Sequence, residues 1–123
     1  MPKIMIVDDD IEFPEVYKVY FRVVGYEVVI ENQSSLAVKT ATANPPDLFL
    51  LDLMMPEPDG FQLCRILRAN KNFVRTPIII VTALSDEDSK LVALGAGAND
   101  YLVKPFHIDE LKAGIDLQLG LGE

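Results

Sequence analysis

The stretch Leu48–Gly60 reads Leu-Phe-Leu-Leu-Asp-Leu-Met-Met-Pro-Glu-Pro-Asp-Gly, an apolar run that meets a carboxylate and then breaks into a loop. A short apolar run bounded by turn residues is typical of a strand buried on both faces. Asp52 would then lie at the C-terminal end of that strand. In open α/β sheets this edge is where ligands bind. Asp52 is therefore either a turn residue or a functional carboxylate, and the rest of the chain decides between these.

The chain on either side alternates short apolar runs with helical patterns. Besides the four residues before Asp52, strands are predicted at Lys3–Val7, Tyr26–Glu31, Pro77–Val81 and Tyr101–Val103. Helices are predicted at about 12–24, from Ser34 or Ser35 to 43, and at 60–70, 86–94 and 108–119. Five alternating pairs predict an α/β fold, a five-stranded parallel sheet with helices on both faces. Right-handed crossovers favour a doubly wound, flavodoxin-like (βα)5 sheet of order 2-1-3-4-5.

The helix boundaries also follow from local signals. The first helix shows apolar residues at helical spacing, namely Val16, Val19, Tyr20 and Val23, and Gly25 ends it. Asp10 is its predicted N-cap, Ser34 or Ser35 that of the second helix, and Asp59 that of the third.

Length and charge narrow the class of protein. The 123 residues suit one domain with a real core, and half of them are hydrophobic. A net charge of −8 disfavours direct binding to nucleic acid or to an anionic membrane. The single cysteine, Cys64, excludes an internal disulfide and, without a Cys or His cluster, a zinc site. No apolar run is long enough to span a membrane and no signal peptide is visible, so we expect a cytoplasmic protein.

Polar residues follow four of the predicted strands. The first strand ends at Asp8 and Asp9, the third at Asp52, the fourth at Thr82 and the fifth at Lys104. In the order 2-1-3-4-5 these tips face one edge of the sheet. Three carboxylates in one place favour a cation, and hard oxygen ligands suit Mg²⁺. Mg²⁺ beside a carboxylate, a lysine and a hydroxyl is suited to phosphoryl transfer to aspartate.

These residues give the chain a strong resemblance to the receiver domain of two-component response regulators. The matching segments run in the same order along the chain: Val7–Asp9, Leu50–Pro56, Asp59–Gly60, Thr82–Ala83, Gly95–Tyr101 and Lys104–Phe106.

The resemblance implies a role for each site residue. Asp52 would accept a phosphoryl group from a phosphohistidine on a sensor histidine kinase or phosphotransfer protein. Asp9 would bind Mg²⁺ directly and Asp8 mainly through water, with Asp52 and the backbone carbonyl of Met54 as further ligands. Lys104 would pair with a phosphoryl oxygen. Such a domain is a switch that assists its own phosphorylation and dephosphorylation, and is not an enzyme in the usual sense.

The resemblance also implies a readout. Thr82 would hydrogen-bond the phosphoryl group, and Tyr101 would swing between outward and inward positions as Thr82 moves. The peptide bond between Lys104 and Pro105 would be cis. The change would be read on the surface of the fourth helix, fifth strand and fifth helix.

Two other functions remain as alternatives. A phosphatase of the haloacid-dehalogenase type also forms an aspartyl phosphate, but it needs a second Asp at the position of Met54. A flavin-binding module of the same fold would need a phosphate loop after the first strand. Asp8, Asp9 and Asp10 would repel the flavin phosphate there.

The similarity runs from Lys3 to the end of the chain, and residues 1–123 are expected to form a single receiver domain. The chain is either a stand-alone receiver or the N-terminal part of a longer regulator, with Gly120–Glu123 as the start of a linker. Gly114 replaces an arginine that the DNA-binding subgroup usually carries. We therefore expect a monomer or a weak homodimer.

Overall fold

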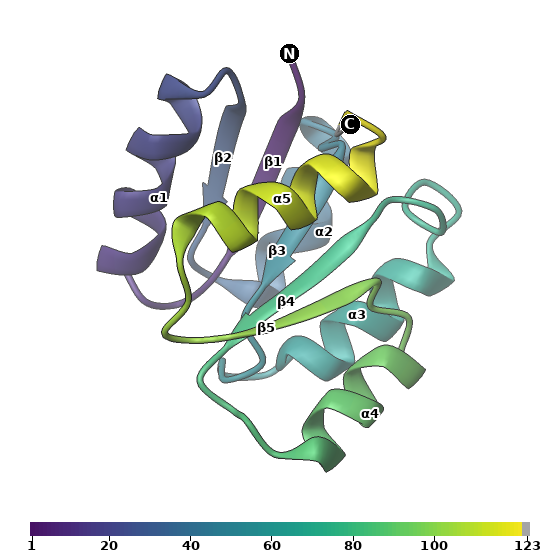
Figure 1. The fold of residues 1–123 in the computed structure, drawn as a ribbon. Helices are drawn as coiled ribbons and strands as arrows, with labels where there is room; N and C mark the ends of the chain where they lie inside the picture. The colour runs from purple at the N-terminus through teal and green to yellow at the C-terminus, as the bar shows by residue number, and fades with distance from the viewer. Residues whose placement is uncertain (122–123) are drawn as a thin grey trace.

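Five parallel strands form the centre of the computed structural model, which describes residues 1–121 (Figure 1). The strands are β1 (Lys3–Val7), β2 (Glu27–Glu31), β3 (Leu48–Leu51), β4 (Ile78–Thr82) and β5 (Asp100–Val103). They pair in the order β2-β1-β3-β4-β5, and every pair is parallel. The predicted fold class and strand order are confirmed. All five strands match their predicted positions to within one residue at each end.

Helices cover both faces of this sheet (Figure 1). They are α1 (Glu12–Val23), α2 (Ala37–Ala43) after a 3₁₀ turn η1 (Ser34–Leu36), α3 (Gly60–Ala69), α4 (Glu87–Gly95) and α5 (Ile108–Leu119). α1 and α5 enclose one apolar core with the sheet, and α2, α3 and α4 enclose the other. None of the helices in residues 1–121 is both long and apolar enough to span a membrane.

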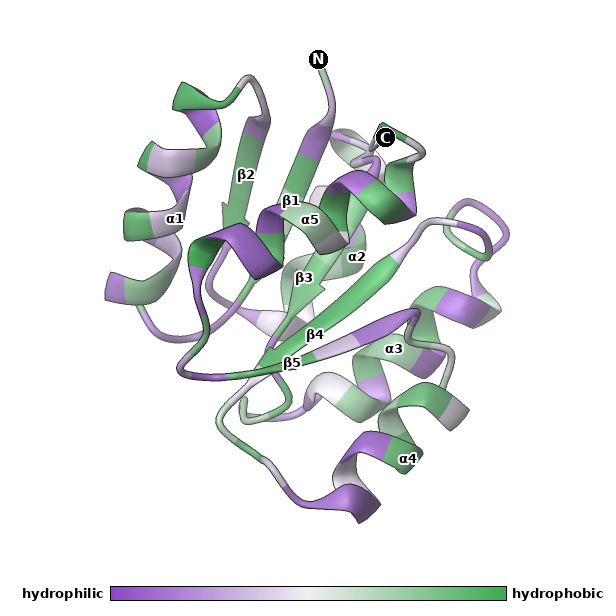
Figure 2. Cartoon of the chain, viewed as in Figure 1, coloured by the Kyte–Doolittle hydropathy of each residue, from purple (hydrophilic) through white to green (hydrophobic). Residues whose placement is uncertain are grey.

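The sheet divides its side chains between the two cores. Ile4 and Ile6 of β1 point into the core under α1 and α5, while Met5 and Val7 point into the other. This alternation follows from the two-residue period of a strand. Figure 2 shows β4 as hydrophobic along its length, as expected of a strand covered by helices on both sides.

The residues that α1 buries differ from the valines that predict the helix. Val16 and Val19 are each 66% exposed and Val23 is 80% exposed. The buried side of α1 instead carries Phe21, which is fully buried, and Tyr17, which packs against the same core. Aromatic rings bury more apolar area than valine, so the helix turns its aromatic side inward.

The predicted caps of α1 and α2 are wrong, whereas the cap of α3 is confirmed. Asp59 accepts from the Gln62 backbone N–H at 2.9 Å, and the Gln62 side chain accepts from the Asp59 N–H at 2.8 Å. The N-cap of α1 is Ile11, one residue after the predicted Asp10. The Asp10 carboxylate accepts from the N–H of Glu12, the first residue of the helix. Neither serine caps α2, because the η1 turn comes first and the Ser34 hydroxyl donates to the Pro56 carbonyl.

Two cis peptide bonds lie in loops beside the carboxyl edge of the sheet. The bond between Lys104 and Pro105 is cis, which confirms the implication of the resemblance. The bond between Glu57 and Pro58 is also cis, and the sequence analysis did not predict it.

Gly60 allows α3 to begin directly against the backbone that follows β3. Its N–H donates to the Leu53 carbonyl at 3.1 Å. A Cβ at this position would lie 2.3 Å from the Asp52 carbonyl oxygen and 2.6 Å from the Leu53 Cα. Both are backbone atoms, so a side chain at position 60 would force the chain beside Asp52 to move.

We therefore expect Gly60→Ala to lower the free energy of unfolding by at least about 2 kcal/mol, because the overlap can be relieved only by moving backbone. Denaturant unfolding measures this. Gly95→Ala is the matched control, because a Cβ there meets nothing within 4 Å at the end of α4. It should be neutral or stabilising by up to about 1 kcal/mol. Equal effects of the two substitutions would contradict this account of Gly60.

Candidate functional site

The site is built where four strands end side by side. Backbone hydrogen bonds continue just past the strands: the Asp52 N–H donates to the Val7 carbonyl at 3.2 Å, and the Lys104 N–H donates to the Thr82 carbonyl at 2.8 Å. These bonds fix where each side chain leaves the sheet. The structure therefore brings together Asp8, Asp52 and Lys104. Asp9, the third predicted carboxylate, is exposed and does not join them in a group of three.

One ammonium is shared between two buried carboxylates. The Lys104 Nζ lies 3.4 Å from an oxygen of Asp8 and 3.4 Å from an oxygen of Asp52. The Asp8 side chain is only 2% exposed and that of Asp52 is 11% exposed. With all three groups ionised, the cluster carries one uncompensated negative charge in a poorly hydrated place. Such a cluster favours a further cation.

The surroundings of Asp8 act on its acidity. Burial is the main cause that raises the pKa of Asp8 above its ordinary value, and the nearby charge of Asp52 adds to it. The Asp10 N–H, which donates to Asp8 at 2.9 Å, and the Lys104 ammonium act in the opposite direction. The ionised form of Asp8 is therefore under-stabilised by the protein alone.

The donor chemistry fits Mg²⁺, a hard cation that proteins hold with one or two carboxylates and several waters. Asp8 and Asp52 supply two such carboxylates. Within residues 1–121, no three His, Cys, Asp or Glu side chains form a ready-made metal group. Asp9 is exposed and lines a cavity of about 200 Å³ with residues of the β2–α2 loop, including Asn32 and Gln33. A metal at the site would thus draw on water and backbone oxygen as well.

Asp52 itself is oriented by the loop that follows it. One of its oxygens accepts from the Met54 N–H at 3.1 Å, and the other faces Lys104. The Met54 side chain is 55% exposed, at the rim of the site. Its thioether adds no acidic group beside Asp52.

The Thr82 hydroxyl is connected to Tyr101 through one residue of the β4–α4 loop. Thr82 is fully buried, and its hydroxyl accepts from the Leu84 N–H at 3.4 Å. The Tyr101 hydroxyl donates to the Leu84 carbonyl at 2.8 Å. The Tyr101 ring is 9% exposed, so it occupies an inward position, and burial raises the pKa of Tyr101.

One residue of the site was missed by the sequence analysis. The ring of Phe13 lies against the Lys104 ammonium, with Nζ 3.9 Å from the ring centroid. An aromatic residue in the first turn of the helix after Asp8 and Asp9 was the available signal. That pattern does not by itself show which strand end the ring reaches.

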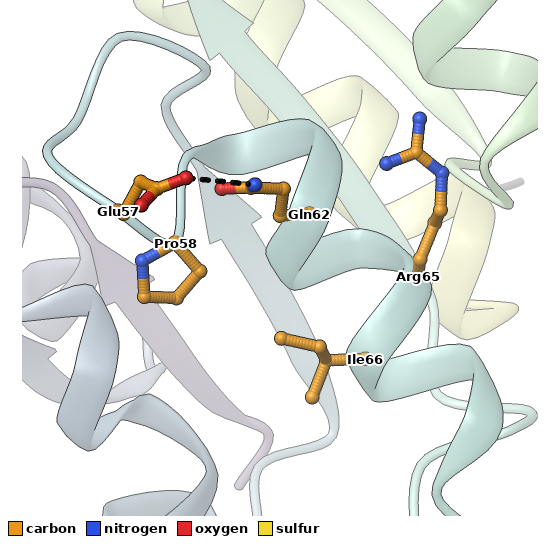
Figure 3. Close-up of a pocket in the computed structure, with 5 residues that line it drawn as sticks. All are labelled: Glu57, Pro58, Gln62, Arg65 and Ile66. Carbon is orange, nitrogen blue, oxygen red and sulfur yellow. Dashed lines mark hydrogen bonds between the residues drawn. The ribbon is translucent and has the colours of Figure 1, made fainter.

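An open groove lies elsewhere on the described residues. It has a volume of about 510 Å³ and is lined by Glu57, Pro58, Gln62, Arg65 and Ile66, near the start of α3 (Figure 3). A hydrogen bond from Gln62 to Glu57 crosses it at 3.2 Å. It contains none of the charged residues at the strand ends, so the candidate site is a polar sheet edge and not this groove.

The sequence matches the family model of the response regulator receiver domain over residues 4–116. The chain belongs to this family. Its receiver domain is 42% identical over 119 residues to the response regulator ArlR of Staphylococcus saprophyticus. The alignment covers 97% of this chain and 53% of that protein, so the chain spans about half the length of this curated relative.

Solved receiver domains share the same fold. The receiver domain of sensor histidine kinase PA1611 from Pseudomonas aeruginosa, solved with a magnesium ion coordinated in its active site cleft, aligns with a TM-score of 0.88 at 34% identity. That alignment covers 97% of this chain and 98% of the other. The BeF3-activated receiver domain of Klebsiella pneumoniae RstA aligns with a TM-score of 0.89 at 34% identity, covering 95% and 97% of the two chains.

We expect Asp8→Asn to raise the free energy of unfolding without added Mg²⁺ by roughly 0.5–2 kcal/mol, because it removes a buried charge beside Asp52. Because the folded protein raises the pKa of Asp8, the penalty exists only where Asp8 is ionised. The gain should therefore be full at neutral pH and vanish as the pH falls and Asp8 takes up a proton.

Denaturant unfolding at neutral and acidic pH measures this gain. Asp9→Asn is the control, since Asp9 is exposed and should change the stability little. An Asp8→Asn protein that is less stable than wild type at neutral pH would contradict the charge argument.

Proposed function

We propose that this receiver domain is a phosphorylation-controlled signalling switch in which Asp52 is the phosphoacceptor. The observation that supports it most is the Lys104 ammonium, 3.4 Å from both Asp8 and Asp52 at the carboxyl edge of the sheet. This ammonium can pair with a phosphoryl oxygen on Asp52. The Asp8 carboxylate beside it can hold a metal.

Transfer from a phosphohistidine is a displacement at phosphorus. An oxygen of Asp52 forms the new bond to phosphorus, the P–N bond breaks, and its electron pair stays on the imidazole nitrogen, which takes a proton from solvent. The Met54 N–H holds the Asp52 carboxylate by one oxygen, and Lys104 lies beside the other. The ammonium balances negative charge on the phosphoryl oxygens, as charge-assisted pairing does elsewhere.

Mg²⁺ fits this chemistry because, when bound, it offsets the negative charge of the carboxylates and phosphoryl oxygens. Asp8, Asp9, Asp52 and the Met54 carbonyl are the groups that would hold it. The magnesium in the active site cleft of the PA1611 receiver domain supports the assignment.

The path from Thr82 through Leu84 to Tyr101 is the proposed readout. A phosphoryl group on Asp52 offers the Thr82 hydroxyl a charged acceptor. A shift of Thr82 moves the backbone of Leu84, whose carbonyl accepts from the Tyr101 hydroxyl. The affected surface is that of α4, β5 and α5, where a downstream partner would bind.

The partner upstream is a sensor histidine kinase or a phosphotransfer protein, in the cytoplasm. Direct binding of nucleic acid by this domain is disfavoured by its net charge of −8. For the oligomeric state we propose a monomer or weak homodimer, since Gly114 leaves Asp100 without an arginine on α5. Residues 1–123 form one receiver domain in this proposal. Gly120–Glu123 begin a linker if the regulator is longer, although residues 122 and 123 lie outside those described.

A phosphatase of the haloacid-dehalogenase type remains the weaker proposal. It needs a general acid two residues after the nucleophile, and the thioether of Met54 has no proton to give.

Asp52→Asn should abolish phosphorylation by acetyl phosphate, because the amide cannot replace the carboxylate as nucleophile. Wild type should take up one phosphoryl group in a Mg²⁺-dependent way, measured by intact mass. Asp59→Asn is the matched control, since asparagine caps α3 about as well as aspartate and the same loop is altered. Phosphorylation of the Asp52→Asn protein at wild-type stoichiometry would show that another carboxylate is the acceptor.

Mg²⁺ should stabilise the folded domain, because it relieves the repulsion between Asp8 and Asp52. At about a hundred times its Kd, it should add roughly 2.7 kcal/mol to the free energy of unfolding. Thermal melts with and without the ion measure this. Asp9→Ala should reduce the shift, while Asp88→Ala, on an exposed carboxylate of α4, should keep it. The metal assignment is wrong if wild type shows no shift or if Asp9→Ala keeps all of it.

A further inference from the structure

Three partners hold the Lys104 ammonium, and one of them is an aromatic ring. The Phe13 centroid is 3.9 Å from Nζ, while the Asp8 and Asp52 oxygens are each 3.4 Å away. Both carboxylate contacts are longer than the usual charge-assisted hydrogen bond, so neither fixes the ammonium alone. A cation against an aromatic face is attracted by the electrons of the ring, most strongly where water is scarce. The ring is therefore a substantial part of what holds the ammonium.

The Phe13 ring is itself held by two other rings. Its centroid is 4.4 Å from that of Tyr17, one turn along α1, and 6.4 Å from that of Phe106 in an edge-on arrangement. Tyr17 and Phe106 are 5.8 Å apart. These three residues form an aromatic cluster that joins α1 to the loop after β5. Because Phe106 follows Lys104 by two residues, the cluster links the ring to the segment that carries the ammonium.

We propose that Phe13 is a positioning residue for Lys104. Its ring holds the ammonium beside Asp52, so that a phosphoryl group on Asp52 meets a cation that is already in place. The ring does not draw the ammonium away from Asp52, because both contacts occur together in the structure. The inference rests on the proposed role of Asp52 as phosphoacceptor.

Packing alone is the competing explanation. Phe13 and Tyr17 are four residues apart on α1, and such pairs stabilise a helix whatever lies above them. The two roles differ in one respect. A positioning role needs the Lys104 ammonium, whereas a packing role does not.

A double-mutant cycle separates the two roles. The probe is beryllofluoride with Mg²⁺, titrated into the protein and followed by backbone amide NMR. Phe13→Leu should weaken its binding about fivefold, the loss expected from one partly buried cation–π contact. Phe13→Tyr keeps a ring and should restore most of the affinity. In a Lys104→Ala background, Phe13→Leu should add less than about a twofold loss.

Phe106→Leu is the matched control, because it removes a ring of the same aromatic cluster that does not lie over the ammonium. It should bind the probe nearly as well as wild type, because the closer Tyr17 ring, 4.4 Å from that of Phe13, still holds Phe13 in place. The proposal is overturned if Phe13→Leu weakens binding equally with and without Lys104. It is also overturned if Phe106→Leu causes the same loss, or if Phe13→Leu binds the probe more tightly.

A second measurement needs no metal and no phosphoryl analogue. The Phe13 ring should shift the NMR signals of the Lys104 ε-methylene upfield in the free protein, and Phe13→Leu should remove this shift. An unchanged signal would refute the contact. A wild-type protein that does not bind beryllofluoride would instead count against the proposed function, while the ring-current shift would still test the contact itself.

Discussion

Two carboxylates and one ammonium, all away from bulk water, form the interaction on which the site depends. Burying charge costs free energy, and Asp8 shows this cost in its raised pKa. The apolar strands β1, β3 and β4 offset the cost, because they are buried along nearly their whole length. Burial of these strands thus stabilises the fold enough to keep the uncompensated negative charge of the cluster at the edge of the sheet. That charge is suited to attract a cation, which in the proposed function is Mg²⁺.

The backbone around Asp52 is as constrained as its charge. Gly60 lies against the carbonyl of Asp52. The capping box of Asp59 and Gln62, on either side of Gly60, fixes the start of α3. Asp52 therefore cannot shift along the sheet edge without disturbing α3. Precise placement of reacting groups is worth several kcal/mol in catalysis, and here the same contacts provide both placement and stability.

The strand order and the gathering of Asp8, Asp52 and Lys104 were predictable, since apolar runs mark parallel strands and the order fixes which tips meet. The exposure of the α1 valines was not predictable. Sequence spacing does not show which of two apolar sides of a helix packs against the core. The caps of α1 and α2 failed for a similar reason: Asp10 and Ser34 found other backbone partners. The contact of Phe13 with Lys104 joins residues 91 positions apart and appears only in the tertiary structure.

The contacts of Tyr101 limit how strongly the proposed readout can respond. Tyr101 is held by one hydrogen bond to a backbone carbonyl, so the side chain at position 84 can vary while the loop path cannot. A ligand shifts a two-state equilibrium only by its differential interaction with the two states. One hydrogen bond of about 1 kcal/mol would change the population ratio only about fivefold. Burial of the Tyr101 ring adds about 1.5–3 kcal/mol. A sharp switch at this face must therefore couple the hydrogen bond to the movement of the whole ring, and through the ring to α4 and β5.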